Sequence, residues 1–230
     1  MSSGLEVLGG YKTEIQDATA ALFADAPKLL DVELSDDGAE ALDRLEAYAQ
    51  RPGKCLRGSV AALTYDMAAG TEHAPEGVQL GAVLELMQSY LLIIDDVMDR
   101  SPLRRGAPSL HMLYQEAGSD EHEAGMLAIS VGLIAQHLGS LSLQQLAVPA
   151  EARLQVMGLM HRNMAITGFG QFDDVAHVNL SRPAKVDIVD TYRKKTSYYT
   201  FVNPLQLGFA LAGKADAATL RDCEAYGLPA

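Results

Sequence analysis

Three carboxylates and two guanidinium groups fall within one short stretch, LLIIDDVMDRSPLRRG, residues 91–106. If the helix that begins near Glu76 continues through Asp99, the carboxylates of Asp95 and Asp99 lie on one face, about 6 Å apart. Like charges so placed repel, and a hard cation such as Mg²⁺ relieves the repulsion while it recruits phosphate oxygens. Asp96 points around the helix, where it can bind a water or orient a neighbour.

Arg104 and Arg105 follow in a loop that contains proline and glycine. Planar guanidinium groups bind phosphate oxygens through two parallel hydrogen bonds. An isolated run of aspartates is more often a solvated helix end. Two features argue against that reading, because carboxylates near a helix C-terminus oppose the helix dipole and the amide of Gln88 interrupts the apolar face before Asp95. Carboxylate-bound Mg²⁺ facing paired arginines therefore predicts a diphosphate site.

A second basic element, RPGKCLRG, occupies residues 51–58. Lys54 and Arg57 lie three apart, at the start of the next predicted helix behind Gly53. A helix N-terminus adds free amides and a favourable dipole for an anion. This signal is weak alone, because a basic residue after a helix break is usually just solvated. Two anion sites in one acidic protein indicate two phosphorylated substrates.

The elements that must position these groups are helices. Apolar residues recur at intervals of three and four, as in Leu80, Val83, Leu84, Met87, Leu91 and Ile94. Alternating β-branched runs typical of strands are missing. Proline and glycine breaks, one of them at Ser181 to Pro183, divide the chain into about nine helices. No linker or repeat separates these helices, so we predict one all-α domain over residues 1–230.

Composition limits the partners and the compartment. The 230 residues contain 18 Lys and Arg against 30 Asp and Glu, a formal charge of −12, so a nucleic-acid backbone is excluded as a general partner. The two cysteines, Cys55 and Cys223, are too far apart for a disulfide framework, which favours a reducing compartment. The N-terminus lacks a secretory pattern, and no run approaches about 18 uninterrupted apolar residues. We therefore expect a cytoplasmic protein without a membrane span.

These stretches resemble the motifs of the trans-isoprenyl diphosphate synthases. LLIIDDVMDRSPLRRG is similar to the first aspartate-rich motif, DDxxD followed by RRG, and GKCLRG to the early Gly-Lys motif. ELMQSYLLIIDD places an amide at the family's usual position, GQFDD resembles the Gly-Gln-x-x-Asp motif, and YRKKTSYYTFVNP resembles the Lys-Thr motif. The resemblance covers essentially the whole chain, in the family's order.

The resemblance implies an all-α isoprenoid-synthase fold, with helices around a central active-site cavity, and commonly a homodimer. It also implies a Mg²⁺-dependent, short-chain trans-prenyltransferase of isoprenoid biosynthesis. In similar enzymes an allylic diphosphate ionises while Mg²⁺ held by the aspartates neutralises the departing diphosphate. The double bond of isopentenyl diphosphate then attacks the carbocation, and a proton is lost.

The resemblance also assigns roles to single residues. The implied catalytic groups are Asp95, Asp99, Arg104 and Lys195. The implied metal ligands are Asp95 and Asp99, Asp96 less directly, and Asp174 through metal or water. The allylic diphosphate is assigned to Arg104, Lys195 and Thr196. Isopentenyl diphosphate is assigned to Lys54, Arg57, Gln88 and Arg105. Gln171, of the Gly-Gln motif, joins the substrate-binding set.

Five further residues near the motifs carry expectations of their own. In this family, bulk at the fifth and fourth positions before the first Asp limits product growth, so Tyr90 and Leu91 imply a product of 15 or 20 carbons. We favour geranylgeranyl over farnesyl diphosphate. His111 either caps the site or packs at a helix start. The pair Tyr198 and Tyr199 has helical spacing and is expected in the core.

The second aspartate-rich motif of the family is absent, and the chain stops at Ala230, where that motif should begin. We therefore expect a truncated chain whose activity requires the missing C-terminal helices. A catalytically incomplete diphosphate-binding or regulatory subunit is one alternative. A class I terpene cyclase is another, but it needs no isopentenyl site, and the set Lys54, Arg57, Gln88 and Arg105 argues against it.

Overall fold

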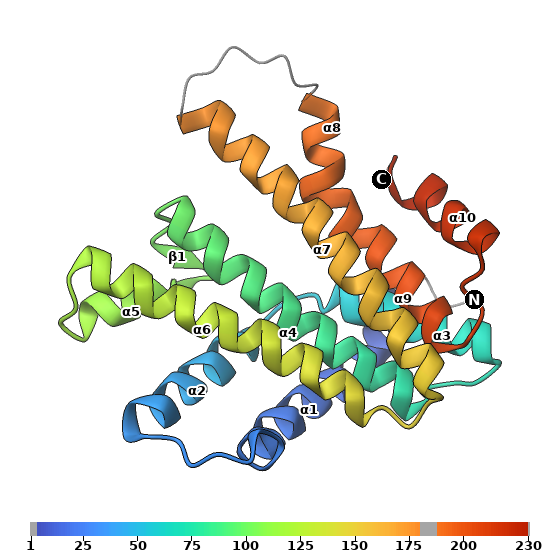
Figure 1. Ribbon diagram of the computed structural model, residues 1–230, viewed down its shortest axis with the longest axis horizontal. Coiled ribbons are helices and arrows are strands. Elements are labelled where there is room, and N and C mark those ends of the chain that lie inside the picture. The colour runs from blue at the N-terminus through green and yellow to red at the C-terminus, as the bar shows by residue number, and fades with distance from the viewer. Residues whose placement is uncertain (1–3, 180–187, 230) are drawn as a thin grey trace. The chain divides into compact units, whose positions relative to one another are not determined.

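The regular structure of the chain is almost entirely helical (Figure 1). The computed structural model describes residues 4–179 and 188–229. Within them, the helices and strands in chain order are α1 (Gly4–Leu30), α2 (Asp36–Ala49), α3 (Leu56–Ala69), α4 (Pro75–Met98), β1 (Leu103–Arg104), β2 (Ala107–Pro108), α5 (Leu110–Glu116), α6 (Glu121–Ser142), η1 (Leu143–Gln145), α7 (Ala150–Asn179), α8 (Ile188–Tyr192), η2 (Arg193–Val202), α9 (Asn203–Leu211) and α10 (Ala217–Gly227). The all-α prediction is confirmed, with ten α-helices where about nine were expected. The break predicted at Ser181 to Pro183 lies outside the described residues.

Side chains at the helix starts explain where several helices begin. The Ser35 hydroxyl accepts a hydrogen bond from the Gly38 N–H at 3.2 Å and caps α2. Asp120 and Glu123 form a capping box on α6, in which each carboxylate accepts the other's backbone N–H. The Asp216 carboxylate accepts two backbone N–H groups of α10, and these bonds lower its pKa. Such caps are local and require no tertiary contact.

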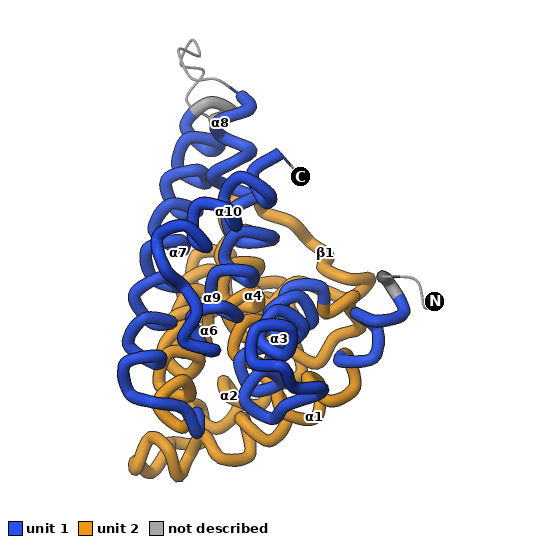
Figure 2. The backbone as a smooth tube through the Cα atoms, turned by 90° about the vertical axis from the view of Figure 1, so that its right-hand side faces the viewer, with its two compact units in different colours: residues 1–11, 56–81, 146–230 blue, residues 12–55, 82–145 orange. Residues whose placement is uncertain are grey.

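The chain divides into two compact units, coloured separately in Figure 2. Unit 1 comprises Met1–Tyr11, Leu56–Gly81 and Leu146–Ala230, and unit 2 comprises Lys12–Cys55 and Ala82–Gln145. Two of the boundaries fall inside α1 and α4, so neither unit is a continuous segment. The assignment of one domain to residues 1–230 stays a prediction.

Unit 2 has an apolar core built from α2, α4, α5, α6 and the larger part of α1. Its buried members are Phe23, Ala26, Leu45, Tyr48, Leu86, Ile93, Leu110, Ala128, Val131, Ala135 and Leu138. Fully burying one large apolar side chain contributes about 1.5–3 kcal/mol. A Cβ on Gly132 would lie 3.2 Å from the side chain of Ile94, so the glycine lets α6 lie close against α4. This core holds the C-terminal half of α4 in place.

Unit 1 packs α3 against α9, and α7 against η2 and α9. A Cβ on Gly208 would lie 2.6 Å from the Thr64 Cβ, so only glycine allows this approach of α9 to α3. The Asn163 amide donates to the side-chain oxygens of Asn203 at 3.1 Å and Gln206 at 2.9 Å, and all three residues are buried. The polar bridge gives α7 and α9 a defined register.

A buried carboxylate joins three segments of unit 1. Asp66 accepts hydrogen bonds from the Tyr11 hydroxyl at 2.7 Å, the Thr71 hydroxyl at 2.6 Å and the Ala74 N–H at 3.2 Å. Burial alone would raise the pKa of Asp66, but the bonds from Thr71 and Tyr11 outweigh it and lower that pKa. His73 stacks on the Tyr11 ring, with centroids 4.3 Å apart. These contacts fix the turn before α4.

Two helical segments among the described residues are long and apolar enough to cross a membrane by length and composition alone. They are Pro75–Met98 and Glu121–Gln145, each with a mean hydropathy of 1.5 over its most apolar window. In Pro75–Met98, 61% of that window is buried, as in the core helix of a globular protein. The absence of a membrane span, inferred from uninterrupted apolar runs, therefore stays a prediction.

Candidate functional site

The last turn of α4 presents two carboxylates one helical turn apart. The Asp99 N–H donates to the Asp95 carbonyl at 2.8 Å, so the helical turn continues one residue beyond Met98. Arg100 then adopts a positive φ of 51°, which ends the helix. The Asp95 side chain is 25% exposed and Asp99 is exposed. The predicted spacing is confirmed, and water reaches both side chains.

Asp96 has a different environment from its two neighbours. It is fully buried, and its Oδ1 accepts hydrogen bonds from the Arg104 Nε, at 2.8 Å, and from the Arg104 Nη2. Its Oδ2 accepts a hydrogen bond from the Tyr48 hydroxyl at 3.0 Å. Arg104 Nη2 also reaches the Asp95 Oδ2 at 3.3 Å. Asp96 therefore orients neighbouring groups, one of the two roles expected for it, and its assignment as a metal ligand stays a prediction.

The paired arginines lie on a two-stranded hairpin, whereas the sequence predicts a loop there. The strands β1 and β2 pair antiparallel, and Arg105 and Gly106 form the two-residue turn between them. Both turn residues have positive φ, 54° and 78°, as a type I′ turn requires. A non-glycine residue with positive φ is strained by about 1 kcal/mol or more. The turn directs the Arg105 side chain differently from that of Arg104.

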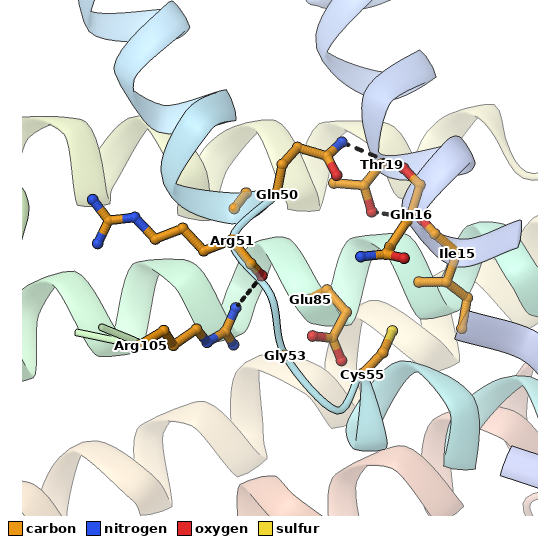
Figure 3. A pocket seen from close by; sticks show the side chains of 10 residues that line it. Ile15, Gln16, Thr19, Gln50, Arg51, Gly53, Cys55, Glu85 and Arg105 are labelled. Carbon is orange, nitrogen blue, oxygen red and sulfur yellow. Dashed lines mark hydrogen bonds between the residues drawn. The ribbon is translucent and has the colours of Figure 1, made fainter. Parts of the chain in front are cut away.

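Arg105 contacts the basic loop that follows α2, within unit 2 (Figure 3). Its Nη1 donates to the Arg51 carbonyl at 3.2 Å. A Cβ on Gly53 would lie 3.1 Å from the Arg105 guanidinium carbon, so glycine leaves room for that group. In return, Arg51 Nη1 donates to the Arg104 carbonyl at 3.4 Å. The two basic stretches predicted from the sequence are thus held together.

Lys54 lies in this loop and not in a helix. The sequence predicts a helix start directly behind Gly53, but α3 begins at Leu56. The delay has a local cause, because Cys55 is buried and adopts a positive φ of 51°, which is outside the helical region. Lys54 is exposed, as an anion-binding group requires.

Arg57, in the first turn of α3, contacts η2 within unit 1. Its Nη2 donates to the Thr200 hydroxyl at 2.8 Å, and its guanidinium lies over the Tyr199 ring, 4.0 Å from the centroid. Tyr199 is half-buried and was assigned to the core from its spacing, as was Tyr198. The Tyr199 ring instead positions the Arg57 guanidinium, and local spacing does not reveal this contact.

Lys195 and Asp174 are brought together in unit 1. The Lys195 Nζ lies 2.5 Å from the Asp174 Oδ2, and the Asp174 side chain remains 41% exposed. The adjacent Lys194 pairs with Asp190 at 2.6 Å. Thr196 is exposed beside Lys195. A lysine ammonium makes a point contact, which a phosphate oxygen can replace with little rearrangement.

The Gly-Gln motif meets the Lys-Thr motif through its glycine. A Cβ on Gly170 would lie 2.4 Å from the Lys195 backbone nitrogen and 2.7 Å from the Lys194 carbonyl carbon. Only glycine permits this approach of α7 to η2. The neighbouring Gln171 is half-buried, and its substrate-binding role stays a prediction. The π-helical hydrogen bonding of η2 is a rare conformation, frequent at functional sites.

The remaining predicted residues lie on α4 and α5. Gln88 and Leu91 are half-buried, and Tyr90 packs against the unit 2 core, where burial raises the pKa of its hydroxyl. His111 is buried in the first turn of α5, with its Nδ1 3.3 Å from the Ser109 hydroxyl, and burial lowers its pKa. His111 thus packs at a helix start, one of its two expected roles. The substrate and chain-length roles of the other three stay predictions.

The donor set for a metal ion consists of hard oxygens. Among the described side chains, no group of three or more His, Cys, Asp or Glu residues is arranged to hold a metal ion. Asp95 and Asp99 provide two carboxylates one turn apart, both reached by solvent. Mg²⁺ characteristically binds one or two carboxylates, several waters and substrate phosphates rather than an all-protein cage. The pair therefore fits Mg²⁺.

Two residues in contact with these groups were not found from the sequence. Tyr48 binds Asp96 across 48 positions of sequence, and the Arg51 guanidinium lies 4.6 Å from the centroid of the Tyr48 ring. For Arg51 the single available signal was its place in the sequence, two residues before Gly53 of the Gly-Lys motif. Contacts at such separation depend on tertiary packing, which periodicity does not report.

Comparison with known proteins identifies relatives over most of the chain. The polyprenyl synthetase family model matches residues 39–230. A farnesyl pyrophosphate synthase of Nezara viridula is 28% identical over 190 residues, 77% of this chain and 44% of the relative. A geranylgeranyl diphosphate synthase of Pantoea ananas is 27% identical over 216 residues, 90% of this chain and 67% of the relative. The chain thus spans about half the length of the first of these relatives.

The fold is shared with solved structures. A geranylgeranyl pyrophosphate synthase from Corynebacterium glutamicum, crystallised with isoprenyl diphosphate and magnesium, superposes with a TM-score of 0.84 at 24% identity. The alignment covers 96% of this chain and 64% of that protein. At this identity the likeness establishes the fold, which is the all-α isoprenoid-synthase fold expected from the motifs.

Proposed function

The chain belongs to the polyprenyl synthetase family, and from that premise we propose that it is a short-chain trans-prenyltransferase. It condenses an allylic diphosphate with isopentenyl diphosphate to give a product of 15 or 20 carbons, with geranylgeranyl diphosphate favoured. Farnesyl and geranylgeranyl diphosphate synthases among the relatives support this range. The chain spans about half the length of the first of these relatives, so the activity is proposed for the whole protein.

One observation carries the proposal. Asp95 and Asp99 lie one turn apart at the end of α4, and Arg104 is held beside Asp95 by the buried Asp96. Two hard carboxylates supply ligands for Mg²⁺, and the fixed guanidinium beside them can bind a phosphate oxygen of the same complex. The arrangement supports departure of diphosphate as the first chemical event.

In the proposed reaction, Asp95 and Asp99 hold Mg²⁺, and Arg104, Lys195 and Thr196 hold the allylic diphosphate. Bound Mg²⁺ supplies electrostatic stabilisation of the charge that develops on the leaving diphosphate. The carbon–oxygen bond of the allylic substrate breaks, and its electron pair leaves with the diphosphate. Arg104 cannot lose its charge at neutral pH, and its hydrogen bonds to Asp96 raise its pKa further.

Lys54, Arg57, Gln88 and Arg105 bind isopentenyl diphosphate in this proposal. Its double bond attacks the allylic cation, a new carbon–carbon bond forms, and one proton is lost. The contact of Arg57 with Thr200 and Tyr199 supports the assignment, because it keeps a long flexible side chain in one position before substrate arrives. A terpene cyclase would need no such second set of cations.

The test is incubation of the polypeptide, at the length its own gene encodes, with Mg²⁺, isopentenyl diphosphate and dimethylallyl, geranyl or farnesyl diphosphate. Product sizing by chromatography should give chains of 15 or 20 carbons. Turnover of the allylic substrate without isopentenyl diphosphate would favour a terpene cyclase. Diphosphate binding without turnover would favour a regulatory or catalytically incomplete subunit.

Tyr90 is proposed to limit product length together with Leu91. Its packing against the unit 2 core supports a fixed ring position. Replacing Tyr90 by Ala should lengthen the main product by at least one five-carbon unit, because the ring no longer blocks the growing chain. Chromatography of the products measures the change, and an unchanged profile would exclude Tyr90 as the limit.

A homodimer is also proposed. Five large apolar residues of α6 are exposed, namely Met126, Leu127, Ile129, Leu133 and Ile134. An apolar surface of this kind is typical of an interface between subunits. Light scattering should give twice the mass of one chain.

A cytoplasmic location without a nucleic-acid partner is proposed as well. The acidic composition and the two buried thiols support it, and cell fractionation tests the location.

A further inference from the structure

Asp96 is held entirely by other side chains of unit 2. A fully buried carboxylate is stable only when both oxygens are hydrogen-bonded. Arg104 donates two hydrogen bonds to Oδ1 and the Tyr48 hydroxyl donates one to Oδ2, at 3.0 Å. Burial and the nearby Asp96 charge raise the pKa of Tyr48, so the hydroxyl keeps its proton. The middle aspartate of the motif therefore serves as an anchor.

The position of Arg104 decides the charge around Asp95. Its Nη2 lies between the buried Asp96 and the Asp95 Oδ2, which is 3.3 Å away. A small movement of the guanidinium toward Asp95 would compete with a cation there, and a movement away would withdraw its positive charge from both Asp95 and Asp96. Any group that holds Arg104 therefore affects metal–diphosphate binding.

Arg51 completes a closed ring of contacts. Its guanidinium lies over the Tyr48 ring at 4.6 Å, and its Nη1 donates to the Arg104 carbonyl at 3.4 Å. Arg105 then donates to the Arg51 carbonyl (Figure 3). Burial lowers the pKa of Arg51, in agreement with its place among protein groups. The ring runs from Arg51 through Tyr48, Asp96 and Arg104 and back to Arg51.

We propose that Tyr48 and Arg51 are positioning residues of the diphosphate site: they fix Arg104 through Asp96 and tie the Gly-Lys loop to the arginine hairpin. The inference rests on the proposed function and deepens it. Neither residue is required to touch substrate. Both act by keeping the guanidinium groups where diphosphate will bind, which lowers the reorganisation needed on binding.

Unit 2 contains a matched control for both residues. Arg44 lies over the Tyr114 ring at 4.7 Å, nearly the same geometry as Arg51 over Tyr48. Arg44 is ion-paired with Glu40, one turn away in α2. Tyr114 is half-buried in α5, where it packs against the unit 2 core. The same chemical changes can therefore be made at a pair that does not reach Asp96.

The test measures binding and needs no turnover. The probe is geranyl S-thiolodiphosphate, an allylic diphosphate analogue that does not ionise. It is titrated into the protein in the presence of Mg²⁺, and calorimetry gives the dissociation constant. Tyr48→Phe removes the hydroxyl that holds Asp96 and should raise the dissociation constant about tenfold. That factor corresponds to the free energy of one hydrogen bond to a charged group. Arg51→Lys should raise the dissociation constant by a similar factor, because lysine has no planar fork. Tyr114→Phe and Arg44→Lys should leave it unchanged.

A double-mutant cycle tests whether Tyr48 acts through Asp96. In an Asp96→Ala background, Tyr48→Phe should have no further effect on the dissociation constant, because the side chain that accepts the Tyr48 hydrogen bond is already gone. An equal tenfold loss in both backgrounds would overturn the inference. A purely structural role would lower the unfolding midpoint and leave the wild-type dissociation constant intact, which would also overturn it. Arg51→Lys keeps the test available if Tyr48→Phe fails to fold.

Two results separate this inference from the proposed function. If the unmodified protein binds neither the analogue nor isopentenyl diphosphate with Mg²⁺, the proposed function falls and the inference falls with it. If the unmodified protein binds both and the Tyr48 and Arg51 variants bind equally well, only the inference falls.

Discussion

Two pairs of opposite charge, one in each unit, carry similar assignments from the motifs but differ in their surroundings. In unit 2, Asp96 is fully buried and receives two hydrogen bonds from Arg104 and one from Tyr48. In unit 1, the 41% exposed Asp174 receives one contact from the flexible ammonium of Lys195. The first pair is part of the protein's framework, whereas the second can open for a ligand.

The largest expected difference between the two pairs is in stability. Asp96→Asn should lower the free energy of unfolding by about 3 kcal/mol, because the half-buried Arg104 guanidinium loses its buried carboxylate partner and keeps only the 3.3 Å contact with Asp95 among the described side chains. Asp174→Asn should lower it by less than about 1 kcal/mol, because exposed ion pairs contribute little. Urea unfolding of both variants measures the difference. Equal losses of unfolding free energy would contradict the distinction between a structural pair, Asp96 with Arg104, and a pair that opens for a ligand, Asp174 with Lys195.

A smaller effect is expected from the backbone that carries Lys195. Gly170→Ala should lower the free energy of unfolding by about 1–3 kcal/mol, because its Cβ would lie 2.4 Å from the Lys195 nitrogen. Gly168→Ala is the control on the same helix, with nothing within 4 Å of its Cβ, and should stabilise by about 0.5–1 kcal/mol. Thermal unfolding distinguishes the two signs.

In the arginine hairpin, a substitution can change substrate affinity while the stability of the fold stays nearly the same. Arg105→Asn keeps the turn, because asparagine tolerates positive φ, so unfolding should change by less than about 0.5 kcal/mol. Affinity for isopentenyl diphosphate should fall about tenfold, since a charged hydrogen bond is lost. Calorimetry measures it. Arg100→Asn, at a φ of 51° and at a side chain whose guanidinium lies 3.7 Å from the Glu121 carboxylate, should leave the affinity unchanged.

The smallest effect concerns pH. Burial holds the pKa of His111 below its usual value of 6.5, so the folded state binds the proton less readily than the unfolded state. Stability is therefore complete above pH 6.5 and decreases as pH falls below it. Urea midpoints at pH 7.5 and 5.5 should differ more in the wild type than in His111→Gln. An identical pH dependence of the urea midpoint in both proteins would show that the His111 side chain is not the source of this effect.

Local patterns were sufficient where the determining interactions are local. The helix predicted from near Glu76 through Asp99 is α4, Pro75–Met98, because apolar periodicity and a terminal break define it. The one-turn spacing of Asp95 and Asp99 follows from helix geometry alone. The motifs then identified the family, which the comparison confirmed.

Other features depend on contacts that the sequence does not display. The two-residue strands of the hairpin are too short for any alternation to be detected. The role of Asp96 depends on Tyr48, 48 residues away, and the position of Arg57 depends on Thr200, 143 residues away. Cys55 adopts positive φ, which moved the start of α3 from its predicted place. Each difference has a tertiary or steric cause.

The π-helical segment η2 has a consequence for how relatives of different length are compared. In a π-helix each N–H bonds to a carbonyl five residues earlier, one residue further than in an α-helix. A relative that lacks one residue between Arg193 and Val202 can therefore keep a continuous helix into α9. It would present a different residue to Gly170, so alignment gaps near the Lys-Thr motif should be placed by hydrogen-bond register and not by letter identity.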